Sequence, residues 1–202
     1  MNENLMKALS KQKIFPIIRS NDPDVVVNTV DALVKGGLNI MEVNVESVQI
    51  YEAIKEVSRI ANVCAGGIIT SLQAQAAIDS GAKLFSSPIF HMNLVKLSKD
   101  KRIPYIAGTS TANEAYQAWK ARIPLVKIYP ITAMGGASYL EDILRPMNFL
   151  NILPQGSVKL SDVKKYIDAG AFAVGVGRDL FDGYSYSDIT SRVQEAISKL
   201  KV

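Results

Sequence analysis

Short runs of apolar residues recur along the chain, each followed by a longer segment in which apolar positions repeat with a helical period. Eight runs are present, at Ile14–Ile18, Ile40–Val43, Val63–Ala65, Leu84–Phe85, Tyr105–Ala107, Leu125–Tyr129, Phe149–Leu153 and Phe172–Val176. Successive runs begin about 20 to 25 residues apart, which suits one strand and one helix per unit. Strands that are buried on both faces read as continuous apolar runs. The pattern therefore predicts eight buried, parallel strands.

The segments between the runs carry start and stop signals of helices. Asp22 is a suitable cap before Pro23, a proline at the first helical position. The next apolar residues share one helical face and end at a glycine pair: Val26, Val30, Leu33, Val34, Gly36–Gly37. Similar glycine stops lie at 80–82 and 169–171, and further caps are expected at 70–71, 109–111 and 161–162. A last helix is expected from about residue 187, and an amphipathic segment at 2–12 precedes the first strand.

Eight strand–helix units in 202 residues lie close to the lower size limit of a (β/α)₈ barrel, roughly 200 residues. No linker, low-complexity tract or composition break divides the chain. We therefore predict a single (β/α)₈ TIM barrel domain over residues 1–202, with a short N-terminal helix. The competing interpretation is an open, doubly wound sheet. That fold would want a glycine-rich loop after the first strand, and residues 19–23 contain no glycine.

Composition narrows the function classes. With 48% apolar residues the chain is too hydrophobic to be mainly disordered, and its apolar runs are far shorter than the roughly 20 residues that cross a bilayer. The net charge of +4 suits anionic small molecules as well as nucleic acid. We interpret the basic cluster at 96–102 as the solvated end of a helix, and expect neither a nucleic-acid nor a membrane partner.

The numbers of cysteine and histidine residues argue against a disulfide bond and against a zinc site. The chain has one cysteine, Cys64, and one histidine, His91, so neither an intrachain disulfide nor a zinc site built from these residue types is expected. We interpret His91 as a helix-start or surface residue. The first 13 residues lack the apolar core of a signal peptide, which makes the cytoplasm the default compartment.

Three expected strands carry a charged residue near their carboxyl ends, where barrel enzymes place their active sites. They are Arg19 in FPIIR, Glu42 in IMEV and Lys127 in LVKIYP. Lys127 is either a structural lysine, paired or reaching water, or an amine nucleophile that forms a Schiff base with a ketone. Glu42 is either its structural counterion or a proton carrier, and Arg19 suits a carboxylate. Three charges at one end of a barrel bring no stability benefit, which favours a catalytic site.

A second candidate feature is a phosphate cradle. The segments after the seventh and eighth runs read Pro154–Ser157 and Gly175–Arg178, and small residues let backbone N–H groups approach an anion. The alternative is that these glycines make tight turns only. Gly66–Gly67, after the third run, is a weaker candidate of the same kind.

From end to end, the chain resembles the 2-keto-3-deoxy-6-phosphogluconate and 4-hydroxy-2-oxoglutarate aldolase family, class I aldolases on a small barrel. The resemblance rests on FPIIRS, GGLNIMEV, VCAGG, FSSP, AGTST, LVKIYP, LPQGSV and AVGVG. The lysine motif LVKIYP is the most specific of these and would place the Schiff-base lysine at Lys127; GGLNIMEV would place the catalytic glutamate at Glu42. The resemblance implies that the substrate contacts Arg19, Gly66, Gly67, Pro88, Thr111, Gly156, Ser157, Gly175, Gly177 and Arg178.

The same resemblance implies a reaction. Lys127 would attack the keto carbon of a 2-keto acid, Glu42 would take a hydroxyl proton, and cleavage would release an aldehyde (glyceraldehyde 3-phosphate or glyoxylate) and pyruvate. It implies no metal and no organic cofactor, and a homotrimer.

Departures from the family pattern leave the substrate open. Gly67 replaces a carboxylate-binding threonine, Glu46 lies where some members have an arginine, and Gln155 and Ser157 alter the phosphate loop. The serine that often follows GVG is Arg178. Two other functions therefore remain: a non-catalytic, ligand-binding barrel, and a phosphate-binding barrel enzyme that forms no imine.

Overall fold

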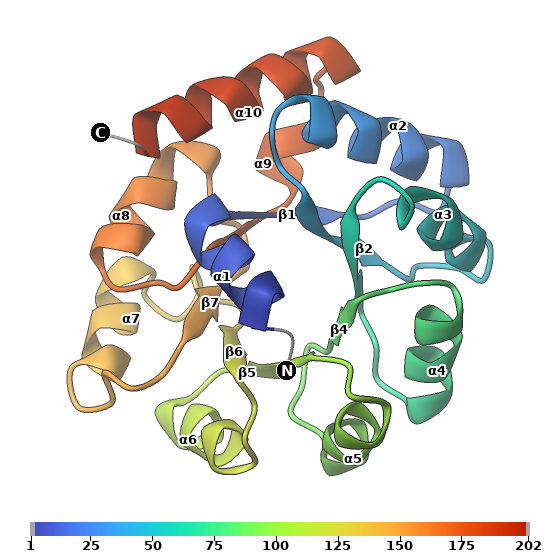
Figure 1. The fold of residues 1–202 in the computed structure, drawn as a ribbon. Helices are drawn as coiled ribbons and strands as arrows, with labels where there is room; N and C mark the ends of the chain where they lie inside the picture. Colours follow the sequence, from blue (N-terminus) through green and yellow to red (C-terminus); the bar gives the residue numbers. More distant parts are fainter. Residues whose placement is uncertain (1–2, 201–202) are drawn as a thin grey trace.

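The apolar runs become eight strands that alternate with helices around a ring (Figure 1). The computed structural model describes residues 3–200. The elements are α1 (Glu3–Gln12), β1 (Ile14–Ile18), α2 (Pro23–Lys35), β2 (Ile40–Asn44), α3 (Ile50–Val57), β3 (Asn62–Gly66), α4 (Ser71–Asp79), β4 (Leu84–Ser86), α5 (Met92–Lys101), β5 (Tyr105–Thr109), α6 (Ala112–Lys120), β6 (Leu125–Ile128), α7 (Ala137–Leu144), β7 (Ile152–Pro154), a 3₁₀ turn η1 (Leu160–Asp162), α8 (Val163–Asp168), β8 (Val174–Val176), α9 (Arg178–Phe181) and α10 (Tyr186–Leu200).

All paired strands are parallel, in the order β7-β6-β5-β4-β3-β2-β1-β8. Beyond these ladders, the Phe172 N–H just before β8 donates to the Ile152 carbonyl of β7 at 2.9 Å, which draws the ring nearly closed. The prediction of a (β/α)₈ barrel is thereby confirmed, and the open doubly wound sheet was the wrong alternative. Among residues 3–200, no helix is both long and apolar enough to cross a membrane.

Alternation along each strand divides the buried residues between two cores. Residues facing the barrel axis form an inner core, and residues on the other strand face pack against the surrounding helices. The inner core comprises Leu5, Leu9, Phe15, Ile17, Ile40, Cys64, Leu84, Ile106, Leu125, Leu153 and Ala173. A charged side chain in phase with this set must therefore lie inside the barrel.

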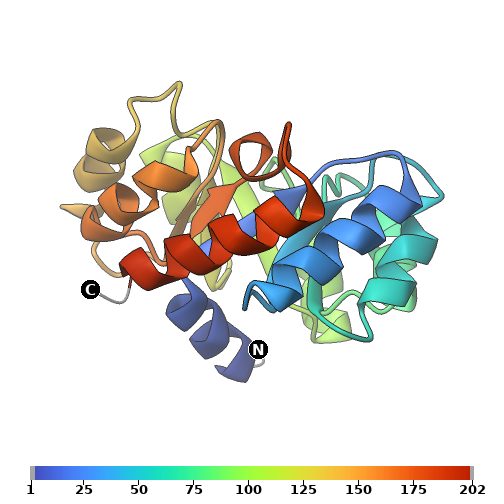
Figure 2. The same ribbon diagram turned by 90° about the horizontal axis from the view of Figure 1, so that it is seen from above.

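Helix α1 covers the end of the barrel where the strands begin (Figures 1 and 2). Leu5 and Leu9 belong to the inner core. The side-chain amide of Gln12 donates hydrogen bonds to the carbonyls of Ile14 and Ile40 and accepts from the N–H groups of Asn39 and Ile40. The predicted amphipathic segment 2–12 is thus a helix over its described part, while residue 2 lies outside the described residues. The carboxyl ends of the strands are left as the end of the barrel that is open to a ligand.

Most predicted helix signals have the expected role. Asp22 caps α2 through the Asp24 N–H, Thr70 and Thr111 cap α4 and α6, and the His91 ring caps α5. At 161–162 the position of the cap is confirmed, because Asp162 is the N-cap residue of α8, but its side chain makes no capping hydrogen bond and both residues belong to the turn η1.

The seventh strand also lies further along the chain than predicted. It spans Ile152–Pro154, whereas the apolar run began at Phe149. Phe149 is 45% exposed and packs against Trp119 of α6 with ring centroids 4.6 Å apart. Part of this apolar run thus belongs to a surface aromatic contact rather than to the sheet.

Candidate active site

Lys127 projects into the barrel from the middle of β6. Two residues earlier on the strand, Leu125 belongs to the inner core, and alternation places Lys127 on the same face. Only 3% of Lys127 is exposed. Its amine is therefore a buried polar group that needs a partner inside the barrel.

Glu42 provides the carboxylate partner from β2, across the barrel. It is in phase with Ile40 of the inner core and is 1% exposed. Its Oε2 atom lies 3.7 Å from Lys127 Nζ, too far for a direct hydrogen bond. Ser86, on β4, fills the gap: its hydroxyl donates to Glu42 Oε2 at 2.6 Å and accepts from Lys127 Nζ at 3.1 Å.

Two glycines lie on the intervening strands at positions with no space for a side chain. A Cβ on Gly66 of β3 would lie 2.5 Å from Glu42 Oε1, and one on Gly108 of β5 would lie 2.3 Å from the backbone of Pro88. Substrate contact by Gly66 stays a prediction; what the structure shows is the space that Gly66 leaves for the Glu42 carboxylate. The backbone of Pro88 lies against Gly108, and Pro88 itself is an exposed residue.

Cys64 of β3 lies in the same buried region. Burial, and then the nearby charge of Glu42, raise the pKa of its thiol well above the usual range. Cys64 therefore stays a neutral thiol, which keeps it from acting as a competing base or nucleophile.

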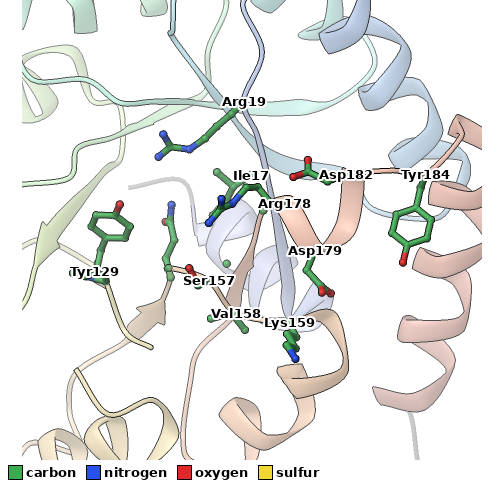
Figure 3. A pocket seen from close by; sticks show the side chains of 15 residues that line it. Ile17, Arg19, Tyr129, Ser157, Val158, Lys159, Arg178, Asp179, Asp182 and Tyr184 are labelled. Atoms are coloured by element: carbon green, nitrogen blue, oxygen red, sulfur yellow. The ribbon is translucent and has the colours of Figure 1, made fainter. Parts of the chain in front are cut away.

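A pocket of about 760 Å³ opens above β1 and β6–β8, at the carboxyl ends of the strands. It contains six of the predicted binding residues: Arg19, Gly156, Ser157, Gly175, Gly177 and Arg178. Its lining also includes Ile17, the register partner of Glu42, and Tyr129, two residues after Lys127. The amine–carboxylate pair thus adjoins the pocket, although neither Lys127 nor Glu42 is part of its lining. Figure 3 shows the guanidinium groups of Arg19 and Arg178 pointing into this space.

Arg19 differs from the other two charges that were expected at this end of the barrel. It follows the last residue of β1, and its side chain is 55% exposed. It pairs with Glu46 rather than with Glu42, Nη1 to Oε1 at 3.4 Å. The Asn44 amide also donates to this Glu46 oxygen, at 3.3 Å. At the rim of the pocket, the positive charge of Arg19 is therefore partly neutralised by Glu46.

Two other predicted binding residues stand apart from this pocket. Gly67 follows β3 with φ of +73°, a conformation that favours glycine, and lies near Asn44. Thr111 is exposed, and its hydroxyl is engaged with Glu114 in the capping box of α6. For Thr111 the structure indicates a helix cap instead of a substrate contact.

Three buried polar residues had no predicted role at the site: Ser86 and Asn44 were missed, and Gln155 was noted only as a change in the phosphate loop. The side-chain oxygens of Asn44 and Gln155 have no hydrogen-bond partner. A signal was available for all three. Asn44 is two residues after Glu42, Ser86 is two residues after Leu84 and Gln155 is two residues after Leu153, so all three are in phase with the residues that face the axis.

A comparison with known families identifies the chain. The model of the family "Aldolase: KDPG and KHG aldolase" matches residues 5–197. The chain belongs to this family. It is therefore an aldolase, a carbon–carbon lyase that releases pyruvate. KDPG and KHG denote the two 2-keto acids named in the sequence resemblance, which is confirmed.

Relatives of this aldolase match it over nearly their whole length. The 2-dehydro-3-deoxy-phosphogluconate aldolase of Haemophilus influenzae is 27% identical, with 98% of each chain covered. The KHG/KDPG aldolase of Escherichia coli K12 is 25% identical, covering 96% of this chain and 95% of that one.

A solved structure shares the fold. The KDPG aldolase of Legionella pneumophila, captured with pyruvate as a covalent carbinolamine, has a TM-score of 0.86 and 20% identity, covering 95% of this chain and 97% of that one.

Proposed function

We propose that this aldolase works through a Schiff base on Lys127, with Glu42 as the proton carrier. The observation that carries the proposal is an amine buried inside the barrel beside a buried carboxylate, next to the pocket. Only the neutral form of an amine attacks a ketone, so the site must provide a route by which Lys127 gives up a proton.

In the proposed reaction, the Lys127 nitrogen attacks C2 of a 2-keto acid, and loss of water leaves an iminium that accepts electrons. Glu42 takes the proton of the C4 hydroxyl, the C3–C4 bond breaks, and an aldehyde departs. Protonation of the remaining enamine and hydrolysis return pyruvate and the free amine.

The substrate we propose is a 2-keto-3-deoxy-phosphosugar acid or 4-hydroxy-2-oxoglutarate, giving glyceraldehyde 3-phosphate or glyoxylate beside pyruvate. Arg19, Arg178 and Lys159 line the pocket and would attract an anionic tail. Gly156, Gly175 and Gly177 would let backbone approach it, and Gly67 and Pro88 would contact the substrate from the β3 and β4 sides.

Borohydride trapping tests the proposal. With pyruvate and borohydride, the protein should gain one reduced pyruvyl adduct, and peptide mapping should place it on Lys127. Lys127→Ala should lose both adduct and cleavage while its thermal unfolding stays cooperative. Lys127→Arg is the matched control, since arginine keeps the charge but forms no imine. Cleavage retained by Lys127→Arg would refute the Schiff-base assignment. If wild type binds 2-keto acids but turns none of them over, the protein is a non-catalytic barrel.

A pyruvate-release assay separates the substrates. We expect cleavage of at least one of 2-keto-3-deoxy-6-phosphogluconate, its galactonate isomer and 4-hydroxy-2-oxoglutarate. Arg178→Ala should raise KM for the two phosphorylated substrates more than for the dicarboxylate, because only their tail carries a phosphate. An equal effect on all three would contradict a phosphate role for Arg178.

We also propose a homotrimer, as the family resemblance implies. Apolar side chains are exposed on consecutive units near the carboxyl ends of β2–β4: Val48 (78%), Ile69 (50%), Leu72 (84%), Ile89 (47%) and Met92 (50%). A second copy of the chain would cover such a patch. Sedimentation equilibrium should give three times 22.0 kDa, and Leu72→Lys should reduce it. A monomeric wild type would refute the proposal.

A further inference from the structure

We propose that Ser86 is a third catalytic residue, whose hydroxyl relays a proton between Lys127 and Glu42. This inference rests on the proposed Schiff-base function, because the relay prepares the same amine for attack. It also gives a role to Ser86, which had none in the predicted site.

The geometry leaves the hydroxyl as the hydrogen-bonded route between the two ionisable groups. The direct distance from Lys127 Nζ to Glu42 Oε2 is 3.7 Å, whereas the steps through Ser86 Oγ are 3.1 and 2.6 Å. The shorter step falls within the range typical of a hydroxyl donating to a carboxylate, 2.5–2.7 Å. A proton can therefore pass along two short hydrogen bonds but not across one long gap.

The surroundings hold this route away from solvent. Ser86 is fully buried, and Glu42 and Lys127 are 1% and 3% exposed. Cys64, on the strand between β2 and β4, faces the same region as a neutral thiol. Gly66 of β3 leaves the space in which the Glu42 carboxylate lies, 2.5 Å from the position of an added Cβ. A water molecule thus has little access to replace the hydroxyl.

The relay is balanced in protons. The Lys127 ammonium gives a proton to Ser86 Oγ while Oγ gives its own proton to Glu42 Oε2. One N–H bond breaks, one O–H bond is exchanged on the serine, and one O–H bond forms on the carboxyl group. The result is a neutral amine beside a carboxylic acid. After the amine adds to the ketone, that acid protonates the departing hydroxyl, which leaves as water, and the carboxylate is regenerated.

A purely structural role for Ser86 makes a different prediction. If the hydroxyl only satisfies two buried polar groups, its loss should lower stability without a specific effect on imine formation. A relay should instead slow the chemical steps and leave substrate binding nearly unchanged. The two roles are therefore distinguished by comparing rates with stability and KM.

The test uses three variants and the rate of imine formation. Pyruvate is mixed with the protein, the reaction is quenched with borohydride at increasing times, and the adduct is measured by mass. Ser86→Ala removes the hydroxyl, Ser86→Thr keeps it, and Ser87→Ala is the matched control. Ser87 is equally buried, but its hydroxyl accepts from the Ile89 N–H and does not join the relay.

We expect Ser86→Ala to slow imine formation and kcat by at least about tenfold, in keeping with proton-transfer catalysis, with KM within threefold of wild type. Ser86→Thr should recover most of the rate, and Ser87→Ala should stay within twofold. In mixtures of H₂O and D₂O, a plot of the imine-formation rate against the D₂O fraction should be curved for wild type, because two protons move. The same plot should be linear for Ser86→Ala.

The outcomes separate this inference from the proposed function. A wild type without an adduct on Lys127 would refute the Schiff base and the relay together. An adduct formed by wild type and Ser86→Ala at the same rate would refute the relay alone. If Ser86→Ala does not fold, Ser86→Cys preserves the volume with a weak donor, and wild-type rates in that variant would overturn the relay.

Discussion

At the scale of single residues, Glu46 sets how much of the Arg19 charge is available to a substrate. The two side chains are 3.4 Å apart, and both are partly exposed. Asn44 holds the same carboxylate oxygen from inside the barrel at 3.3 Å. A substrate carboxylate that approaches Arg19 must therefore compete with Glu46, and it meets a negative charge as it does so.

We expect Glu46→Gln to lower KM for the anionic substrate about two- to fivefold with little change in kcat, the range expected for exposed ion pairs. Arg19 is then free to bind the substrate, and the repulsion disappears. Steady-state kinetics at low and high salt should show the gain shrinking as salt screens the charges. Asp31→Asn, which breaks the exposed pair with Lys35, is the control. A raised KM in Glu46→Gln would mean that Glu46 itself contacts the substrate.

The sequence indicated those site residues whose chemistry is unusual for a buried strand. Lys127 and Glu42 stand out because a charge inside an apolar run needs a reason. Ser86 does not stand out, since a serine is common both in strands and in the turns that follow them. Its partners come from β2 and β6, and which residues meet across a barrel depends on the register of all the strands between them. Neither could be read from the local sequence.

At the scale of elements, capping boxes position the helices that follow β3 and β5. In α6, Thr111 accepts from the Glu114 N–H, and Glu114 accepts from the N–H groups of Ser110 and Thr111. These hydrogen bonds lower the pKa of Glu114 below its usual value. The cap is thus strongest above that usual value and weakens as the pH falls below it.

Thr111→Ala should lower the free energy of unfolding by about 1 kcal/mol and leave kcat/KM within twofold of wild type. The reason is that the hydroxyl serves the helix, whereas the family resemblance gave it to the substrate. Urea unfolding at pH 7 and the pyruvate-release assay measure the two effects. Thr111→Ser, which keeps the cap, should resemble wild type in both. A large loss of activity without loss of stability would restore the substrate-binding role.

Elements with strong periodicity were predictable, and those determined by tertiary contacts were not. The pattern located α2 closely, because its cap, glycines and apolar spacing agree, and the expected start of α10 at about residue 187 lies one residue from Tyr186. The predicted start of β7 was wrong, because Phe149 packs against Trp119 on the surface instead of joining the sheet. Apolar character alone does not show which apolar contact a residue makes. Helix α9 has only four residues, too few to carry a periodic signal.

At the scale of the whole molecule, the barrel separates stability from chemistry along its axis. One end is closed by α1, whose leucines complete the inner core, while the other carries the ionisable groups, the glycines and the pocket. The apolar layers between them exclude water from beneath the Lys127–Glu42 pair. Substitutions of the inner-core residues at the α1 end should therefore affect unfolding, and those of the inward-facing polar residues at the opposite end should affect turnover.

Tyr105 links the pH dependence of the whole fold to one buried phenol. It begins β5, is fully buried, stacks on Phe85 with ring centroids 5.1 Å apart, and donates to the Ile89 carbonyl at 2.7 Å. Burial, as the largest cause, raises the pKa of Tyr105 to about 12, from an ordinary value of 10.0. The folded protein therefore holds this proton more tightly than the unfolded chain does.

The corresponding stabilisation should be fully present below about pH 10 and be lost as the pH rises through 12, because the unfolded phenol ionises first. Two pH units correspond to at most about 3 kcal/mol. Urea unfolding between about pH 8 and pH 11.5 should show wild type losing stability more steeply than Tyr105→Phe, which has no proton to lose. The lysines and other tyrosines titrate in both proteins, so the difference between the two curves isolates Tyr105. Parallel curves would show that the phenol ionises without unfolding the barrel.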